Sequence, residues 1–330
     1  MIETFNQPLP HGITLGCRAT GARGRPVLMF LHGFPEGAFV WDELLRFFAL
    51  PENGAYRCVA PYLRGFGPSS APTEIEAYRP KHLVQDITAL IAIETQSSST
   101  SSTPLACLVA HDWGGAVAWN LANQAPHLMQ QLAIINSPHP GTFLRALQTD
   151  PQQQADSAYL QDLIKPAAET WLAQDDFANL WDFLQPGHGQ GGGSGGDGAA
   201  RQQHANWLTE ELQNCYREVW RAGLTGGCNL YRASPLRPPT AQDPGAAAIE
   251  LPHAMLSVQL PTLVLWGMQD TALLPVLLDG LDDFVKPLTV VPVADASHWI
   301  VHEQPALVMR VLADFLSPPP LSPAPSSPLQ

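Results

Sequence analysis

The fold is decided by one stretch of the sequence, Leu108-Val109-Ala110-His111-Asp112-Trp113-Gly114-Gly115. Its apolar start predicts a buried strand, which runs directly into a helix through a turn that carries the aspartate. Small residues stand two places before and two places after that aspartate, as in the sharp strand-to-helix turn that lifts a nucleophile above an α/β sheet. Small flanks are needed because such a turn is crowded. The amides at the start of the helix favour a negative charge on the central side chain.

Asp112 also decides the chemistry of this turn. Serine is the usual residue at its centre, whereas a carboxylate attacks a saturated carbon and forms an ester, which water must then hydrolyse at the ester carbonyl. An ordinary aspartate in the first turn of a helix is the alternative interpretation. The motifs found elsewhere in the chain argue against that alternative. A serine esterase is disfavoured because no serine occupies the turn.

Short apolar runs predict the rest of the sheet. Each run is continuous rather than alternating, as expected for strands that are buried on both faces of a parallel sheet. Helical segments separate several of them, so the fold class is α/β with a mostly parallel central sheet flanked by helices. The predicted strands are residues 27–31, 57–60, 105–110, 132–135, 262–266 and 288–293. The predicted helices between them are residues 41–49, 80–94 and 115–125.

The strand pattern stops between residues 139 and 260, where the sequence becomes helical and rich in tryptophan. We predict that residues 139–260 form a helical cap on a core of residues 1–138 and 261–316. The cap would cover the carboxyl ends of the strands, where open α/β sheets bind ligands. Residues 187–198 have linker composition and predict a flexible loop, and the Pro/Ser-rich tail of residues 317–330 predicts disorder. The predicted cap helices are residues 157–164, 167–172, 175–184 and 209–222.

Composition and charge narrow the possible partners. The 330 residues carry 30 acidic and 17 basic side chains, a formal net charge of -13. This balance argues against nucleic acid or an anionic membrane as a partner and favours a small neutral organic substrate over an anionic one. No signal peptide is recognisable, and no apolar stretch approaches the ~20 residues of a membrane span. Five cysteines without a C-x-x-C pair fit a reduced setting. We therefore expect a soluble, cytoplasmic protein, and a homodimer is left open.

A second motif, His32-Gly33-Phe34-Pro35-Glu36, stands at the end of a predicted strand. The backbone amide of Phe34, together with that of Trp113, is placed to form an oxyanion hole for the tetrahedral intermediate of ester hydrolysis. Pro35 fixes the turn, with a cis bond as one option. A plain turn at a strand end is the alternative for this motif taken alone. Its pairing with the turn at Asp112 favours the functional interpretation.

An acid and a base follow two predicted strands near the end of the chain. Asp270 closes the run Trp266-Gly267-Met268-Gln269-Asp270, and His298 lies in the run Ala296-Ser297-His298-Trp299. The chain order Asp112, Asp270, His298 is that of nucleophile, acid and base in folds of this kind. Asp295 precedes His298 by only three residues on the same loop, so Asp270 is the predicted acid. A structural role is the alternative for His298 taken alone.

Six motifs together resemble the epoxide hydrolase branch of the α/β-hydrolase fold family, which also contains haloalkane and fluoroacetate dehalogenases. In the family's order they are HGFPE (residues 32–36), RGFGPS (64–69), HDWGG (111–115), NSPHP (136–140), WGMQD (266–270) and ASHW (296–299). The resemblance implies an α/β-hydrolase fold whose helical cap is inserted after the sixth core strand. It also implies that Asp112 is the nucleophile, His298 the base and Asp270 the acid that orients it. The implied reaction opens epoxides to vicinal diols through a covalent aspartyl ester.

The resemblance further implies a proton donor for the leaving alkoxide. The run CNLYRA at residues 228–233 resembles the family's N-x-Y-R element, whose tyrosine hydrogen-bonds the epoxide oxygen. Tyr231 is therefore predicted to donate that proton, a task that suits a phenol. Family members commonly carry a second cap tyrosine, whereas Asp162 stands at the comparable position here. Tyr159 lies one turn earlier on the same helical face, and whether it replaces the missing tyrosine is left open.

Two alternatives to epoxide opening are kept. A haloalkane or haloacid dehalogenase would use the same Asp112, but a halide leaves without a proton and so needs no Tyr231. Haloalkane dehalogenases usually have asparagine where Phe34 stands. A ligand-binding protein that keeps the fold without turnover is the non-enzymatic alternative, and the complete set of Asp112, Asp270 and His298 argues against it. We infer neither a metal, because no cluster has metal-ligand spacing, nor another cofactor. The remaining predicted pocket residues are Tyr159, Pro35 and Trp299.

Overall fold

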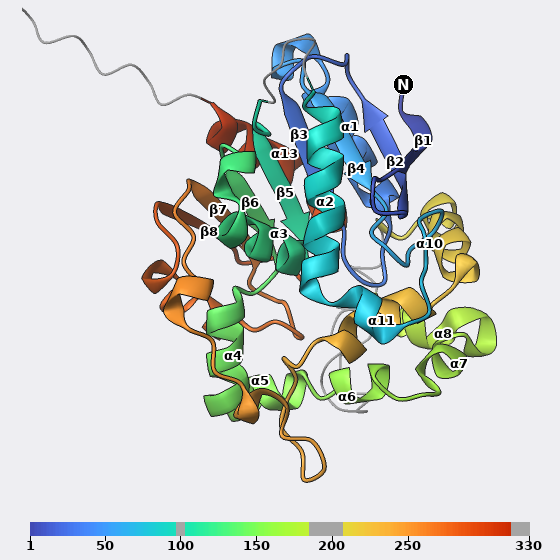
Figure 1. Ribbon diagram of the computed structural model, residues 1–330, viewed down its shortest axis with the longest axis vertical. Helices are drawn as coiled ribbons and strands as arrows, with labels where there is room; N and C mark the ends of the chain where they lie inside the picture. The colour runs from blue at the N-terminus through green and yellow to red at the C-terminus, as the bar shows by residue number, and fades with distance from the viewer. Residues whose placement is uncertain (97–102, 185–206, 318–330) are drawn as a thin grey trace, which may run out of the picture.

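The computed structural model describes residues 1–96, 103–184 and 207–317 (Figure 1). The loop predicted at residues 187–198 lies outside these ranges, as does the predicted tail beyond Ser317. In the ranges described, no helix is both long enough and apolar enough to cross a bilayer.

One eight-stranded sheet organises the chain, in the order β1-β2-β4-β3-β5-β6-β7-β8. β2 pairs antiparallel with both β1 and β4, whereas all neighbours from β4 to β8 pair in parallel. This topology confirms the predicted α/β-hydrolase fold with a mostly parallel sheet. The strands are β1 (Glu3–Pro8), β2 (Thr14–Thr20), β3 (Val27–Leu31), β4 (Arg57–Pro61), β5 (Cys107–His111), β6 (Leu132–Ile135), β7 (Thr262–Gly267) and β8 (Leu288–Val293).

The two antiparallel strands, β1 and β2, were not predicted. β1 reads ETFNQP and no residue in it is fully buried. An edge strand of this kind is polar and half exposed, so it lacks the continuous apolar run that marks the parallel strands. The six predicted strands, by contrast, are all present within one or two residues of their expected ends.

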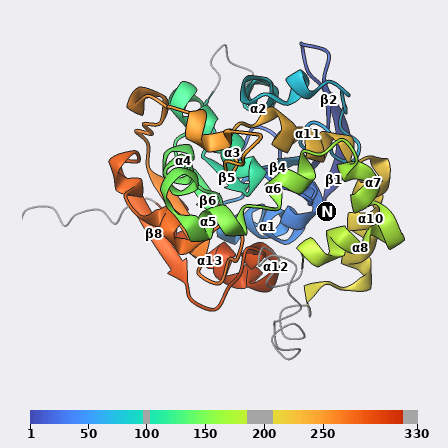
Figure 2. The ribbon, with the colours of Figure 1, turned by 90° about the horizontal axis from the view of Figure 1, so that it is seen from below.

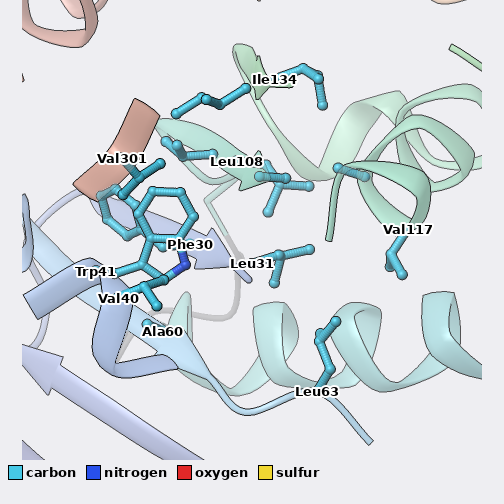
Figure 3. Close-up of a cluster of buried hydrophobic side chains, with 14 of the residues drawn as sticks. Phe30, Leu31, Val40, Trp41, Ala60, Leu63, Leu108, Val117, Ile134 and Val301 are labelled. Atoms are coloured by element: carbon cyan, nitrogen blue, oxygen red, sulfur yellow. The ribbon is translucent and has the colours of Figure 1, made fainter. Parts of the chain in front are cut away.

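Helices cover both faces of the sheet (Figure 2). One face carries α2 (Pro80–Glu94) and α3 (Trp113–Gln124), and the other carries α1 (Asp42–Phe48), α12 (Ile300–Glu303) and α13 (Pro305–Leu316). Every residue of β3 and β5 is buried as a result, because successive side chains of a strand point to opposite faces. Phe30 packs against Trp41 with ring centroids 5.5 Å apart. In Figure 3 Phe30 lies with Trp41 and Val301, whereas its neighbour Leu31 points away from them.

The regular elements described between β6 and β7 are all helical and lie along the edge of the sheet where the parallel strands end (Figure 1). This position confirms the insertion after the sixth strand. The helices α4, α5 and α11 were not predicted. The cap helices are α4 (Pro140–Thr149), α5 (Pro151–Asp156), α6 (Leu160–Leu163), α7 (Ala168–Leu172), α8 (Gln174–Phe183), α10 (Glu210–Ala222) and α11 (Thr225–Ala233).

Two contacts fix the last cap helices on the core. A Cβ atom on Gly226 of α11 would lie 2.2 Å from the Cα atom of Gly65, so only glycines allow the two backbones to approach this closely. The indole nitrogen of Trp220, on α10, donates to the carbonyl oxygen of Pro35 at 2.7 Å. α10 and α11 are therefore held against the loops that follow β3 and β4.

Candidate active site

Asp112 occupies the sharp turn between β5 and α3. Its backbone has φ 48° and ψ -123°, a conformation that strains a non-glycine residue and is typically kept at functional sites. The turn is crowded, since a Cβ atom on Gly114 would lie 2.4 Å from the carbonyl oxygen of Leu31, and one on Gly33 would lie 2.2 Å from Oδ1 of Asp112. The hydroxyl of Ser137 donates to the Asp112 carbonyl at 2.6 Å. These contacts explain the small residues around the aspartate.

Two backbone amides converge on the Asp112 carboxylate. The amide of Phe34 donates to Oδ1 at 2.7 Å, and the amide of Trp113 also hydrogen-bonds the carboxylate. The peptide bond between Phe34 and Pro35 is cis, the option anticipated for this turn. Two amides in this position can hold the negative oxygen that forms when water attacks an ester at the same carbon.

His298 lies between two carboxylates. Its Nδ1 is 2.7 Å from Oδ2 of Asp270, and its Nε2 is 3.8 Å from Oδ2 of Asp112. Asp295, the other carboxylate near this histidine in the sequence, is exposed. The structure therefore brings together the three residues that the motifs single out, with Asp270 rather than Asp295 against the imidazole.

The Asp270 carboxylate is buried and held on both oxygens. The amides of Ala272 and Leu273 donate to Oδ1 at 2.9 and 2.8 Å. The side-chain amide of Asn136 donates to Oδ2 at 2.8 Å, while its own oxygen accepts from the amide of Gly267, also at 2.8 Å. Asn136 belongs to the NSPHP motif, but its contact with Asp270 was not predicted from the sequence. Its place one residue past β6, next to β7 in the sheet, is the signal for that contact.

Charge and burial together shift the pKa values of His298, Asp112 and Asp270. Burial alone would lower the pKa of His298, but the charges of Asp270 and Asp112 and the hydrogen bond with Asp270 raise it to about 9. Burial raises the pKa of the Asp112 carboxyl, and His298 and His111 oppose part of that rise. Burial also acts on Asp270, but there the charge and hydrogen bond of His298 outweigh it and lower the pKa. At pH 7 His298 is accordingly a cation between Asp112 and Asp270.

Two cap tyrosines face Asp112. Tyr231 lies on α11 and Tyr159 immediately before α6, and both line the same cavity as the carboxylate. The Tyr231 ring stands edge-on to Trp113 and Phe34, with ring centroids 5.1 and 5.2 Å away. Burial raises the pKa of both phenols, and the charge of Asp112 raises it further. Both hydroxyls therefore keep their protons and can donate a hydrogen bond into the cavity.

The cavity above Asp112 has a volume of about 240 Å³. Among the residues described as its lining, Asp112 is the one charged side chain, which fits an uncharged ligand. Across residues 1–96, 103–184 and 207–317, no group of three His, Cys, Asp or Glu side chains is arranged to hold a metal ion. The apolar lining includes Pro138, Phe143, Leu160, Leu230, Leu251 and Leu273.

Pro35 and Trp299, which were predicted to lie around the substrate, are not among the residues that line this cavity. The carbonyl of Pro35 instead accepts the hydrogen bond from Trp220. The Trp299 ring stands edge-on to His298 with ring centroids 4.8 Å apart. Both residues thus support the groups around the cavity instead of forming its wall.

Glu36, in the HGFPE motif, is a buried carboxylate next to the site for which no role was predicted. Its Oε2 is 2.9 Å from Nδ1 of His111, whose Nε2 is 2.9 Å from the carbonyl oxygen of His298. The other oxygen, Oε1, lies 3.0 Å from Nε2 of His302 and accepts from the hydroxyl of Tyr216 at 3.2 Å. His111 therefore holds the loop of His298 in place, and Glu36 ties that loop to cap helix α10. The signal for this role in the sequence was a charged residue in the short turn that follows the apolar strand β3.

Sequence comparison places this geometry in a family. A family model described as the alpha/beta hydrolase fold matches residues 26–305. AB hydrolase superfamily protein YfhM of Bacillus subtilis is 31% identical over 310 residues, which cover 93% of this chain and 95% of that protein. Epoxide hydrolase 4 of Homo sapiens is 31% identical over 303 residues, which cover 90% of this chain and 74% of that protein.

Solved structures agree with the sequence comparison. The crystal structure of a Bacillus megaterium epoxide hydrolase in complex with an inhibitor is similar with a TM-score of 0.78 at 27% identity, and the match covers 94% of this chain and 99% of that one. A structure from work on novel epoxide hydrolases in metagenomes from hot environments has a TM-score of 0.72 at 32% identity, covering 96% and 99% of the two chains. The chain belongs to the α/β hydrolase fold family, among relatives that are named epoxide hydrolases.

Proposed function

We propose that this protein hydrolyses small neutral epoxides to vicinal diols in two steps, through an ester on Asp112. The observation that carries the proposal is a carboxylate, in place of the usual serine, at the strand-to-helix turn, with two backbone amides on it and two phenols facing it. Further support comes from the relatives and solved structures that are named epoxide hydrolases.

In the first step an oxygen of Asp112 forms a bond to one epoxide carbon, and the bond from that carbon to the ring oxygen breaks. The ring oxygen takes a proton from Tyr231 or Tyr159, because a neutral phenol can donate to an oxygen that develops negative charge. The tyrosine regains a proton from water. Because ester formation removes the negative charge of Asp112, the pKa of His298 falls, and the imidazolium gives its proton to the hydroxide left when the tyrosine was reprotonated. The neutral imidazole is then available as a base.

In the second step water attacks the ester carbonyl, and His298 takes the proton of the water. The amides of Phe34 and Trp113 hold the resulting oxyanion, and Asp270 stabilises the imidazolium. The tetrahedral intermediate then breaks the bond between the carbonyl carbon and the diol oxygen. That oxygen takes the proton from His298. Asp112 is left as a carboxylic acid and passes its proton to the neutral His298, which restores the carboxylate and the imidazolium of the resting site.

The test is to trap the ester. His298→Gln keeps a polar side chain of similar reach but removes the base, so the variant should alkylate and then stop. With a panel of small epoxides, the intact mass should rise by the mass of one epoxide, and the adduct should map to the peptide of Asp112. The variant His298→Gln/Asp112→Asn is the matched control and should show no adduct. Turnover of an epoxide by the wild type without any adduct on His298→Gln would overturn the proposed mechanism.

Dehalogenation is kept as an outcome of this test, with alkyl halides included in the same panel. A halide leaving group needs N–H donors and no proton, whereas two phenols face Asp112 in this cavity. Those hydroxyls are what an epoxide oxygen requires, and they favour epoxide opening. Adducts from alkyl halides alone would reverse this preference.

The organisation of the chain is part of the proposal. We propose that residues 1–138 and 261–316 act as the core and residues 139–260 as the cap, which is supported by the helices found between β6 and β7. We also propose a cytoplasmic setting, which is supported by the five cysteines because all of them are free thiols. They are Cys17, Cys58, Cys107, Cys215 and Cys228. A homodimer stays a prediction, and the mass of the protein in solution would test it.

A further inference from the structure

The cavity follows one face of α3. Asp112, Ala116 and Asn120 all line it, and residues four apart in a helix lie one above the other. With a rise of 1.5 Å per residue, Asn120 lies roughly 12 Å from Asp112 along the helix axis. The cavity is therefore longer than an epoxide ring requires, and its far part is a place for the remainder of the substrate.

The cavity along α3, called the corridor below, has a mostly apolar wall, and part of that wall packs outside the main hydrophobic core. Phe143, Leu236, Ile249 and Leu251 line the cavity and pack on a second hydrophobic cluster, which includes Leu147. Among the described lining residues there is no lysine, arginine or histidine. A substrate that carries a carboxylate or phosphate would therefore lose its hydration here without gaining a countercharge.

Asn120 places a hydrogen-bond acceptor on this cavity. The other side-chain oxygens of neutral polar residues outside the two cap tyrosines are already engaged with the backbone: Tyr78 donates to Pro72, Ser137 donates to Asp112, and Ser234 accepts from Leu236. Its side-chain nitrogen donates to the carbonyl oxygen of Ala116 at 2.8 Å, which turns the nitrogen back toward its own helix. In the described part of the chain nothing donates to its Oδ1. An acceptor on an apolar wall binds a ligand most favourably when the ligand supplies a donor, because a polar group covered by apolar atoms without a partner is unfavourable.

We propose, resting on the function proposed above, that the substrates are elongated neutral epoxides with a hydroxyl at the end remote from the ring, and that Oδ1 of Asn120 accepts a hydrogen bond from that hydroxyl. Asp112 then selects the reacting end, and Asn120 selects the far end. Ala116 lies between them, and its small side chain leaves room for the connecting chain. Asn120 is thus a specificity-determining residue of the same site.

The test uses two matched series of terminal epoxides that differ in chain length, one ending in a hydroxyl and the other in a methyl group. For the wild type, the ratio of kcat/KM between hydroxyl and methyl substrates should peak at one chain length, at about five- to tenfold, the effect of one hydrogen bond in a partly buried site. Asn120→Leu should remove the peak. Asn120→Asp keeps an acceptor at the same position and should restore it. Gln124→Leu, at an exposed position on the same helix, is the control and should keep it.

A second variant tests the corridor without removing the acceptor. Ala116→Leu narrows the cavity between the two ends, so kcat/KM for long epoxides should fall relative to that for short ones. A hydroxyl-to-methyl ratio that does not change with chain length in the wild type, or that persists in Asn120→Leu, would overturn the role of Asn120. An unchanged long-to-short ratio in Ala116→Leu would overturn the corridor. Neither result affects the trapping of an ester on Asp112, so the two proposals fail separately.

Discussion

The core half and the cap half of this site are built in different ways. Asp112, Asp270 and His298 each follow the carboxyl end of a parallel strand, so the sheet itself brings them to one edge. Tyr231 lies on α11 and Tyr159 immediately before α6, and their places depend on how the cap packs on the core. The order of the strands therefore determines where the nucleophile, acid and base lie, whereas the packing of the cap on the core determines where the proton donors lie.

The two halves should therefore respond differently to substitution. Each residue of the core half has one task that no neighbour shares, so its loss should be close to complete. The two tyrosines of the cap half share one task, so either alone should retain part of the activity.

The largest effect is expected at Asp112. Asp112→Asn removes the nucleophile but keeps the size of the side chain, and asparagine tolerates the positive φ of this position. Epoxide turnover should fall by at least ~10⁴-fold, as for other catalytic nucleophiles. Diol formation under steady-state conditions measures this loss, and an unchanged melting temperature shows that the fold is kept. A variant that retains a tenth of the wild-type rate would remove Asp112 from the nucleophile's role.

Asp270 should have the next largest effect, and on the second step alone. Asp270→Asn removes the charge that holds His298 as a base, so ester hydrolysis should slow by ~10²- to 10⁴-fold while alkylation continues. The ester should therefore accumulate and be visible by mass. Asp295→Asn, on the loop of His298 but exposed, is the matched control and should stay near wild type. The reverse ranking of these two variants would show that the acid is assigned to the wrong strand end.

The cap half should lose activity in stages. Tyr231→Phe and Tyr159→Phe keep their rings, and each should slow epoxide alkylation by roughly tenfold because the other phenol still donates. The double variant should lose the full contribution of a placed acid, ~10²- to 10⁴-fold. Pre-steady-state alkylation by one epoxide and one alkyl halide measures the effect, and the halide rate should not change. If Tyr231→Phe alone slows alkylation as much as the double variant does, Tyr159 does not donate a proton and only packs against its neighbours.

The same contrast explains what could be predicted from the sequence. The turn at Asp112 and the strand ends before Asp270 and His298 are local patterns, and they were predicted from short motifs. The contact of Asn136 with Asp270 depends on which strands are neighbours. The approach of Gly226 to Gly65 depends on how the cap docks. No local pattern encodes either contact, and the position of Tyr159 over the cavity was left open for the same reason.

The smallest effect concerns stability and tests the charge arrangement of the core half. The pKa of His298 is raised from 6.5 to about 9 in the folded protein, so its protonation stabilises the fold fully below pH 6.5, and this stabilisation is lost as the pH rises through about 9. His298→Gln has no such group. The difference in unfolding free energy between wild type and this variant should therefore shrink by about 1 kcal/mol from pH 7 to pH 8. Denaturant unfolding of both proteins at each pH measures it, and the subtraction removes the groups that they share. A constant difference would mean that the flanking carboxylates do not hold the proton on His298, and a growing one would reverse the sign of the shift.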